Sequence, residues 1–325
     1  MKIIGFGNAL VDVLVPIDDE SVLQELRLPK GGMTLIDDQT YSLLHATLSD
    51  LPTTRATGGS AANTILALSA LYPDTVFVGT VGKDDYGDFF RDLQLRQGID
   101  SRLAYSDACS TGIATTFISP DRERTFATFL GAAALVDADT IPYNSGDLLH
   151  IEGYMVQNHD VIEDVLSRAK QTGMTVSYDL ASWNIVEQDR DFIRHLVTHY
   201  VDIVFANQEE AAAYCQTEDM EVAVAELAKD CPIAVVKLGK HGAVAHCKND
   251  DKAVFVPVTT VGNVVDTTAA GEFFAAGFLY GYATHQPMDK CLGFGHRLAG
   301  EVIQVMGTQV TSEQLRKAIG MTNDE

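Results

Sequence analysis

Short apolar runs alternate with longer segments of helical periodicity along most of the chain. The predicted strands occupy residues 3–7, 76–81, 148–152, 175–179, 203–206 and 233–238. The predicted helices occupy residues 61–71, 86–97, 161–171, 208–214, 222–229, 271–282 and 292–306. Strands that alternate with helices form a mostly parallel sheet with helices on both faces, so the pattern predicts an α/β fold.

Two regions break this alternation and carry β-type patterning. Residues 9–37 contain VDVLVPI and MTLID, and residues 111–130 contain GIATTFIS and RTFATFL on either side of a turn at 120–123. We expect both regions to form one small sheet, a lid that covers a substrate and excludes water. The α/β core then comprises residues 1–8, 38–110 and 131–325. An extension of the main sheet and a dimer contact are alternative uses of the same strands.

Composition narrows the class of ligand. The 325 residues are 46% hydrophobic and include 45 acidic and 23 basic side chains, for a formal charge of −22. This charge disfavours nucleic acids and anionic membranes as partners. An anionic ligand must therefore be held locally by helix N-termini, a metal ion and a few lysines. The five cysteines form no CxxC pair, and we identify no signal peptide or membrane-length apolar run, so we expect a reduced, cytoplasmic protein.

The segment VVDTTAAGEFFAAGFLYG joins a cluster of small residues to an apolar helix. The first N–H groups of a helix lack internal partners and lie at the positive end of its dipole. Ala269, Ala270 and Gly271 therefore offer an open site for a phosphate. Glu272 stands beside them and could take a proton from an attacking hydroxyl. The combination suggests a kinase.

A second group of residues suits a polyhydroxylated ligand. Asn8 and Asp12 follow the first strand, at the end of an α/β sheet where ligands bind. One carboxylate can accept hydrogen bonds from two neighbouring sugar hydroxyls. Gly58 and Gly59 let the backbone approach a bound molecule closely, and Asn63 offers a donor and an acceptor.

A third group suits a nucleotide with its metal ion. Asn207 and Glu210 lie one turn apart at a predicted helix start. Glu210 could hold Mg²⁺ through water, because this ion keeps most of its hydration shell and uses few carboxylates. Lys237, Gly239 and Gly242 follow another strand, and these glycines would let a nucleotide lie against the backbone.

Each of these segments also has an ordinary structural explanation. Thr267 or Thr268 could cap a core helix. Asp12 could be a turn acid on the surface, and the GGS string a turn with an N-cap. Taken singly, the segments that begin at Asn207 and Lys237 are routine strand-to-helix loops.

Together the strings resemble the ribokinase or PfkB family of sugar and nucleoside kinases. The matching strings run from residue 7 to residue 281 and are GNALVD, GGSAAN, GKDDYG, ANQEE, KLGKHG and VVDTTAAGEFFAAGFLYG. Three further strings, KGGMTLID, IEGYM and VDIVFANQEEA, look like the bacterial adenosine-kinase-like branch. The resemblance implies a ribokinase-like core, a β lid and MgATP as phosphoryl donor.

The resemblance also implies a role for each matching residue. Asp12, Gly59 and Asn63 would bind sugar hydroxyls, with Asn8 and Gly58 beside them. Asn207 and Glu210 would organise phosphate and magnesium, and Thr267, Lys237, Gly239 and Gly242 would border the nucleotide. Ala269, Ala270 and Gly271 would form the anion hole, with Glu272 as the base. Adenine would lie near His296, although a packed or surface histidine is the alternative, and many members bind a monovalent cation such as K⁺ near this loop.

Two positions depart from the family pattern. Ala269 replaces the commonest glycine of the family's DTxGAGD motif, a tolerated variation. Glu272 replaces an almost invariant aspartate. The extra methylene moves the carboxylate by about 1 Å, and misplacement on that scale can cost roughly 10²-fold in rate.

These observations leave three hypotheses. The first is an ATP-dependent nucleoside kinase that prefers adenosine and phosphorylates its 5′-hydroxyl. The second is a sugar kinase for ribose or a ketose such as fructose, and the third is a ligand-binding protein whose kinase activity is weak or lost. A nucleoside needs an apolar slot for its base. The slot could form from residues of the predicted lid, Met33, Ile36, Phe117, Phe126 and Phe129.

Overall fold

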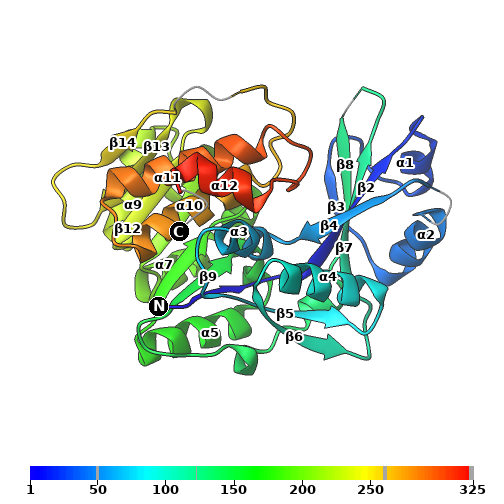
Figure 1. Cartoon of the computed structure of the whole chain (residues 1–325), viewed down its shortest axis with the longest axis horizontal. Coiled ribbons are helices and arrows are strands. Elements are labelled where there is room, and N and C mark those ends of the chain that lie inside the picture. The colour runs from blue at the N-terminus through cyan, green and yellow to red at the C-terminus, as the bar shows by residue number, and fades with distance from the viewer. Residues whose placement is uncertain (49–50, 122, 259–261, 322–325) are drawn as a thin grey trace.

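The computed structural model describes residues 1–48, 51–121, 123–258 and 262–321. A nine-stranded sheet forms the centre of the molecule, in the order β14-β13-β12-β11-β10-β9-β1-β5-β6 (Figure 1). The strands from β12 to β6 are parallel, and β13 and β14 are antiparallel. Their bounds are β1 Ile3–Phe6, β5 Thr75–Gly82, β6 Asp100–Ser106, β9 Leu148–Glu152, β10 Thr175–Asp179, β11 Ile203–Asn207, β12 Ile233–Lys237, β13 Ala243–Cys247 and β14 Val254–Val256.

Helices cover both faces of this sheet, because successive strand residues point to opposite sides. Ile3 packs into one apolar cluster and Ile4 into the other. The first cluster is closed mainly by α3 Ser60–Ser69, α4 Asp85–Arg96, α10 Ala270–Ala283, α11 Met288–Val302 and α12 Ser312–Ile319. The second is closed by α5 His159–Thr172, α6 Trp183–Gln188, α7 Arg190–Tyr200, α8 Gln208–Cys215 and α9 Met220–Asp230. The predicted α/β fold with a mostly parallel sheet is therefore confirmed.

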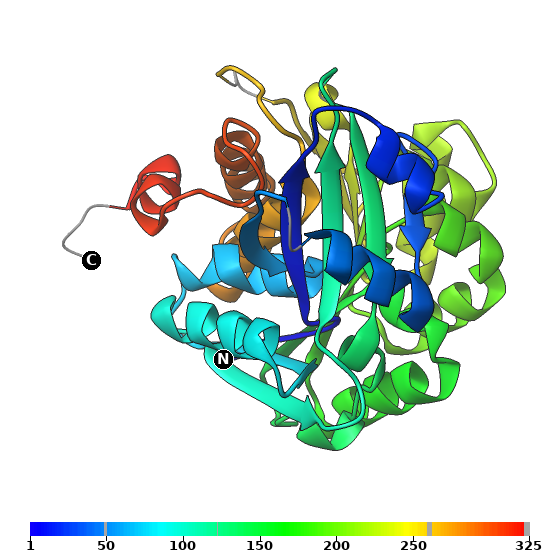
Figure 2. The ribbon, with the colours of Figure 1, turned by 90° about the vertical axis from the view of Figure 1, so that its right-hand side faces the viewer.

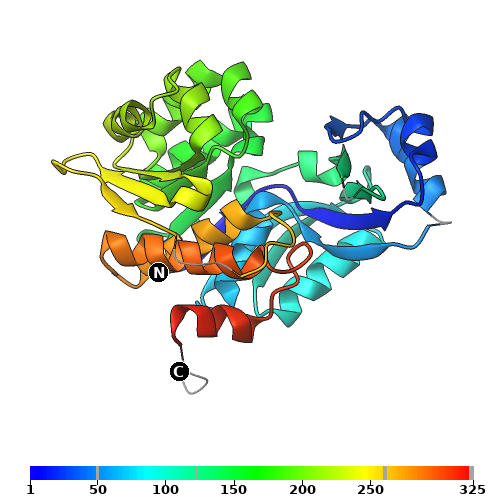
Figure 3. The same cartoon turned by 90° about the horizontal axis from the view of Figure 1, so that it is seen from above.

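A second sheet of five strands stands beside the first, in the order β3-β8-β7-β2-β4 (Figures 1 and 2). Its strands are β2 Leu10–Pro16, β3 Met33–Leu35, β4 Thr54–Gly58, β7 Gly112–Ile118 and β8 Arg124–Phe129. β7 and β8 form the predicted hairpin, although Arg122 of its turn lies outside the described residues. Figure 3 shows this sheet projecting to one side of the body, together with α1 Ser21–Glu25 and α2 Asp38–Leu48.

One strand of the small sheet falls outside the predicted lid segments. β4 lies within residues 38–110, which we assigned to the core, yet it pairs antiparallel with β2 from Leu10↔Gly58 to Leu14↔Thr54. Its sequence TRATG has no alternation of apolar and polar residues, so patterning could not identify it as a strand. None of the helices in the described part of the chain combines the length and apolar character that crossing a bilayer requires.

Candidate functional site

A cavity of about 480 Å³ lies where the two sheets meet. It is lined from the large sheet and its helices by Asn8, Gly59, Ser60, Asn63, Glu152 and Glu272. It is lined from the small sheet by Leu10, Asp12, Leu14, Met33, Leu35, Arg124, Phe126 and Thr128. Ligands of open α/β sheets bind at the carboxyl ends of the strands, and this cavity has that position.

Asp12 lines the cavity from β2 of the lid sheet, within residues 9–37. The chain leaves β1 at Phe6 and enters β2 at Leu10, so Asp12 projects from β2. A Cβ at Gly58 would collide with the Asp12 carboxylate, and a Cβ at Gly59 would collide with the carbonyl oxygen of Asn8. The two glycines therefore keep the floor of the cavity open. Burial raises the pKa of Asp12 to about 7, and the charge of Glu272 adds to this effect.

Asn8 is held by a buried acid that we did not predict. Oε1 of Glu152 accepts hydrogen bonds from the Asn8 backbone N–H at 3.0 Å and from Nδ2 at 2.6 Å. Oε2 accepts one from the backbone N–H of Ala61 at 2.8 Å. Burial raises the pKa of Glu152 to about 7 although these bonds favour its ionised form. Glu152 thus ties β1, β9 and the start of α3 together beneath the cavity.

Asn63 supplies an unused acceptor to the same cavity. The residue is 5% exposed. Within the described part of the chain, its Oδ1 has no hydrogen-bond partner. A buried amide oxygen without a partner is costly, so a ligand hydroxyl at this position would stabilise it.

The first turn of α10 is open to a ligand. The helix begins at Ala270 and has no side-chain cap; its N-cap residue, Ala269, has φ +62°. Thr268 donates from its N–H and its hydroxyl to Oδ1 of Asp266, at 2.9 and 2.8 Å, so it does not cap the helix. Across the described ranges, the N–H groups of Gly271 and Glu272 make no hydrogen bond to another residue. The geometry therefore favours an anion hole over an ordinary capped core helix.

An arginine from the lid reaches the loop before this helix. Nη1 of Arg124, at the start of β8, lies 2.7 Å from Oδ1 of Asp266 and donates to the hydroxyl of Thr268 at 2.5 Å. Burial would raise the pKa of Asp266, but hydrogen bonds from Arg124, Thr268 and Gly307 outweigh it, so the pKa is lowered. Sequence reasoning missed this contact because its two ends are 142 residues apart in the chain.

Buried charges surround the first turn of α10 on the core side. Nζ of Lys237 lies 2.9 Å from Oδ2 of Asp179, at the ends of β12 and β10. Burial disfavours the ammonium form of Lys237, but Asp179, Glu210 and Glu272 together raise its pKa. Burial and the Asp179 charge raise the pKa of Glu272, and Lys237 opposes them. The raised pKa means that Glu272 binds a proton more readily than an exposed glutamate does.

Asn207 and Glu210 form a capping box at the start of α8. Oε2 of Glu210 accepts from the Asn207 N–H at 2.7 Å, and Oε1 accepts from Nδ2 at 2.7 Å. Burial raises the pKa of Glu210 to about 7. Within the described ranges, no three His, Cys, Asp or Glu side chains form a metal site. Mg²⁺ bound mainly by substrate phosphates needs one or two carboxylates at most, so contact to Glu210 through water fits this donor set.

The predicted nucleotide loop after β12 has two glycines with positive φ. Gly239 has φ +55°, and a Cβ there would point into open space. Gly242 has φ +129°, and a Cβ there would collide with the carbonyl oxygen of Val256.

His296 packs on Phe274 with 5.4 Å between ring centroids, and burial lowers its pKa. Its surroundings match the alternative of a packed histidine. Thr267 is exposed beside the anion hole.

Only part of the predicted base slot lines the cavity. Met33 and Phe126 do so, together with the unpredicted Leu35. Phe117 is fully buried in the lid, and Phe129 stacks on Tyr41 with ring centroids 4.0 Å apart. Ile36 packs against the apolar core. Patterning identified the apolar positions of these strands but not the sheet face from which each side chain projects.

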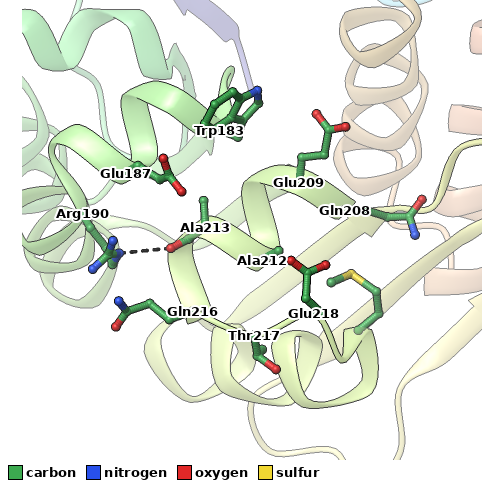
Figure 4. Close-up of a pocket in the computed structure, with 11 residues that line it drawn as sticks. Trp183, Glu187, Arg190, Gln208, Glu209, Ala212, Ala213, Gln216, Thr217 and Glu218 are labelled. Carbon is green, nitrogen blue, oxygen red and sulfur yellow. Dashed lines mark hydrogen bonds between the residues drawn. The ribbon is translucent and has the colours of Figure 1, made fainter.

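A second and wider hollow, of about 650 Å³, lies between α6 and α8 (Figure 4). Trp183, Glu187, Glu209 and Glu218 line it, and Nε of Arg190 donates to the carbonyl oxygen of Ala213 at 3.1 Å. None of the predicted site residues lines this hollow. The cavity between the sheets is therefore the candidate active site.

The sequence matches the pfkB family of carbohydrate kinases over residues 40–315. The chain belongs to this family. It is therefore an ATP-dependent sugar or nucleoside kinase, as the sequence motifs predicted. The family implies ATP as phosphoryl donor, typically with Mg²⁺, and a small-molecule acceptor.

Three similar proteins illustrate the relatives of this chain. The crystal structure of adenosine kinase from Sinorhizobium meliloti has a TM-score of 0.86 and 31% identity, covering 98% of both chains. A probable sugar kinase from Rhizobium etli has a TM-score of 0.87 and 31% identity, covering 99% of both chains. Adenosine kinase of Saccharomyces cerevisiae is 25% identical over 96% of this chain and 98% of its own length. The ribokinase-like fold is thereby confirmed, and both acceptor classes occur among the relatives.

Proposed function

We propose that this kinase transfers the γ-phosphoryl group of ATP to the primary hydroxyl of a nucleoside, with adenosine preferred. The supporting observation is that polar and apolar side chains line the same cavity. Asp12, Asn63 and Glu272 suit sugar hydroxyls. Met33 and Leu35 of the lid add apolar surface and are 51% and 52% exposed. A sugar alone would leave that apolar surface uncovered, whereas a nucleobase would cover it.

The chemistry follows from the first turn of α10. Glu272 takes the proton of the acceptor hydroxyl as its oxygen bonds to the γ-phosphorus. The bond from that phosphorus to the β–γ bridging oxygen breaks, and the electron pair leaves with ADP. The N–H groups of Gly271 and Glu272 stabilise charge on the transferring group. Glu210 would hold Mg²⁺ through water, and the bound ion would supply positive charge that offsets the charge of the nucleotide phosphates.

A sugar kinase is the second candidate, supported by the probable sugar kinase from Rhizobium etli at 31% identity. A binding protein with weak activity is the third, because Glu272 stands where the family uses aspartate. The anion hole, however, has the open N–H groups that transfer requires. Asp12, Gly59 and Asn63 line the same cavity as Glu272, which supports an active enzyme.

The acceptor is tested by steady-state ADP production from MgATP with adenosine, guanosine, ribose and fructose. We expect adenosine to give the highest kcat/KM, at least about tenfold above ribose, because a buried base adds roughly 1.5–3 kcal/mol of binding. A higher value for ribose or fructose would favour the sugar kinase. Ligand-induced thermal stabilisation without ADP production would favour the binding protein.

A further inference from the structure

A largely buried lysine lies beside the first turn of α10. Nζ of Lys237 lies 2.9 Å from Oδ2 of Asp179, and the side chain is 15% exposed. A Cβ added at Gly271 would lie 3.2 Å from the same Nζ. The ammonium is therefore next to Gly271, whose N–H makes no hydrogen bond to another residue in the described part of the chain.

The surroundings of this lysine are strongly acidic. Asp179, Glu210 and Glu272 all influence it electrostatically, and Asp12 and Glu272 interact across the cavity. A phosphoryl group that enters such a region is repelled unless a fixed cation faces it. We infer that the Lys237 ammonium binds the γ-phosphoryl group and stays on it during transfer, as a further catalytic residue. This inference rests on the proposed kinase function.

Asp179 is the positioning residue for this lysine. Its Oδ1 accepts a hydrogen bond from the Ala181 N–H at 2.9 Å, and its Oδ2 holds Nζ of Lys237. Both carboxylate oxygens are thus occupied at the end of β10. The fixed carboxylate keeps the lysine beside Gly271 rather than on Glu210 or Glu272.

Lys237 keeps its proton throughout the reaction. The proton of the acceptor goes to Glu272, and the electron pair of the broken P–O bond goes to ADP. The ammonium stabilises the charge on the non-bridging oxygens of the transferring group. It also favours the ionised form of Glu272, the form that can act as a base.

The chain contains a similar ion pair at the opposite edge of the large sheet, between α5 and the residue that precedes β11. Nζ of Lys170 lies 2.7 Å from Oδ1 of Asp202, and Oδ2 of Asp202 accepts from the Val176 N–H at 2.8 Å. This pair has the same chemistry as the Lys237–Asp179 pair but lies far from the cavity. Lys170→Met is therefore the control for Lys237→Met.

The binding test compares a nucleotide that has a γ-phosphoryl group with one that lacks it. Calorimetric titrations use AMP-PNP and ADP, each with Mg²⁺, on the wild type, Lys237→Met, Lys237→Gln and Lys170→Met. We expect both Lys237 variants to lose about tenfold in affinity for AMP-PNP and less than about threefold for ADP. Equal losses for the two nucleotides, or no loss, would overturn the inference. Circular dichroism verifies folding, and Lys237→Gln serves if Lys237→Met does not fold.

The kinetic test asks whether Lys237 stabilises charge on the transferring phosphoryl group or only supports the structure around it. With the best acceptor, Lys237→Met should lower kcat by about 10²-fold with acceptor KM unchanged, and the acidic limb of kcat/KM should move to higher pH. A variant kcat within about threefold of wild type would overturn the inference. If wild type phosphorylates no acceptor, the proposed function fails, whereas the AMP-PNP and ADP titrations still decide the role of Lys237.

Discussion

The two sides of the cavity differ in how their side chains are held. On the core side, Glu152 makes three hydrogen bonds, and Lys237 is paired with Asp179. On the lid side, Met33 and Leu35 are half exposed, and Arg124 alone links the lid to the loop before α10 in the described structure. Charged side chains held by several hydrogen bonds suit a reaction that needs fixed geometry. Exposed apolar side chains suit a ligand whose own apolar surface covers them. We therefore propose that the core supplies the groups for phosphoryl transfer and that the lid selects the acceptor.

The largest expected effect is on the core side. Glu272→Gln removes the proposed base, and we expect kcat to fall by about 10²–10⁴-fold. Glu272→Asp keeps the carboxylate and restores the residue usual in the family, so its kcat should equal or exceed that of wild type. Both are measured as ADP production at saturating MgATP and acceptor. Equal activity of all three proteins would remove Glu272 from the reaction.

Substitution of Asp12 tests a residue of the lid sheet that we expect to bind the hydroxyls of the acceptor. Asp12→Ala should raise the acceptor KM by roughly 10²-fold, since two hydroxyls lose a charged acceptor. The ATP affinity, measured by calorimetry, should change less than about twofold. The reverse pattern, weaker ATP binding with an unchanged acceptor, would refute the assignment.

Arg124 tests the connection between the two sides. Arg124→Ala should lower kcat/KM by roughly tenfold because the lid loses its ion pair with Asp266. Arg102→Ala is the matched control, since Arg102 makes an exposed pair with Asp100 at 3.0 Å. Similar kinetics for both variants would show that the lid contact has no role in turnover.

The apolar wall itself should have a smaller and selective effect. Leu35→Ala should reduce kcat/KM for adenosine by about threefold to tenfold and leave ribose unchanged, because only a base contacts this side chain. Leu43→Ala is the control, an exposed leucine on α2 that does not line the cavity. An equal loss for adenosine and ribose would contradict a base-binding lid.

The smallest effect concerns pH and stability. Burial raises the pKa of Asp12 and Glu152 to about 7. Between about pH 4.5 and 7 the folded chain therefore binds more protons than the unfolded chain, and stability falls as the pH rises. We expect the melting temperature at pH 5.5 to exceed that at pH 8 by roughly 2–4 °C. Glu152→Gln should reduce this difference; an unchanged pH dependence would contradict the assignment.

Much of the fold was predictable because apolar runs and helical periodicity are local signals. The alternation predicted β1, β5, β9, β10, β11 and β12 of the large sheet but not β6, β13 and β14, and the small-residue cluster predicted the open start of α10. The string TRATG carries no such signal, so β4 was assigned to the core. The helix α7 was absent from our prediction, although its pattern DFIRHL is amphipathic.

The site was predictable where a motif places its residues together. Asn8, Asp12, Gly59, Asn63 and Glu272 all line one cavity. Glu152, Asp179 and Arg124 were missed because their partners are distant in sequence, and only the folded chain brings them together. The lid phenylalanines were partly wrong for a related reason. Alternation separates the two faces of a strand, but the tertiary packing decides which face meets the ligand.

The most direct test of the account is to identify the product by ³¹P and ¹H NMR after incubating the protein with MgATP and adenosine. We predict one equivalent of ADP and one of a nucleoside monophosphate whose phosphorus couples to the two 5′ protons. ATP hydrolysis to free phosphate, or no ADP at all while adenosine is bound, would contradict the claim that Glu272 and the open start of α10 direct phosphoryl transfer to the nucleoside.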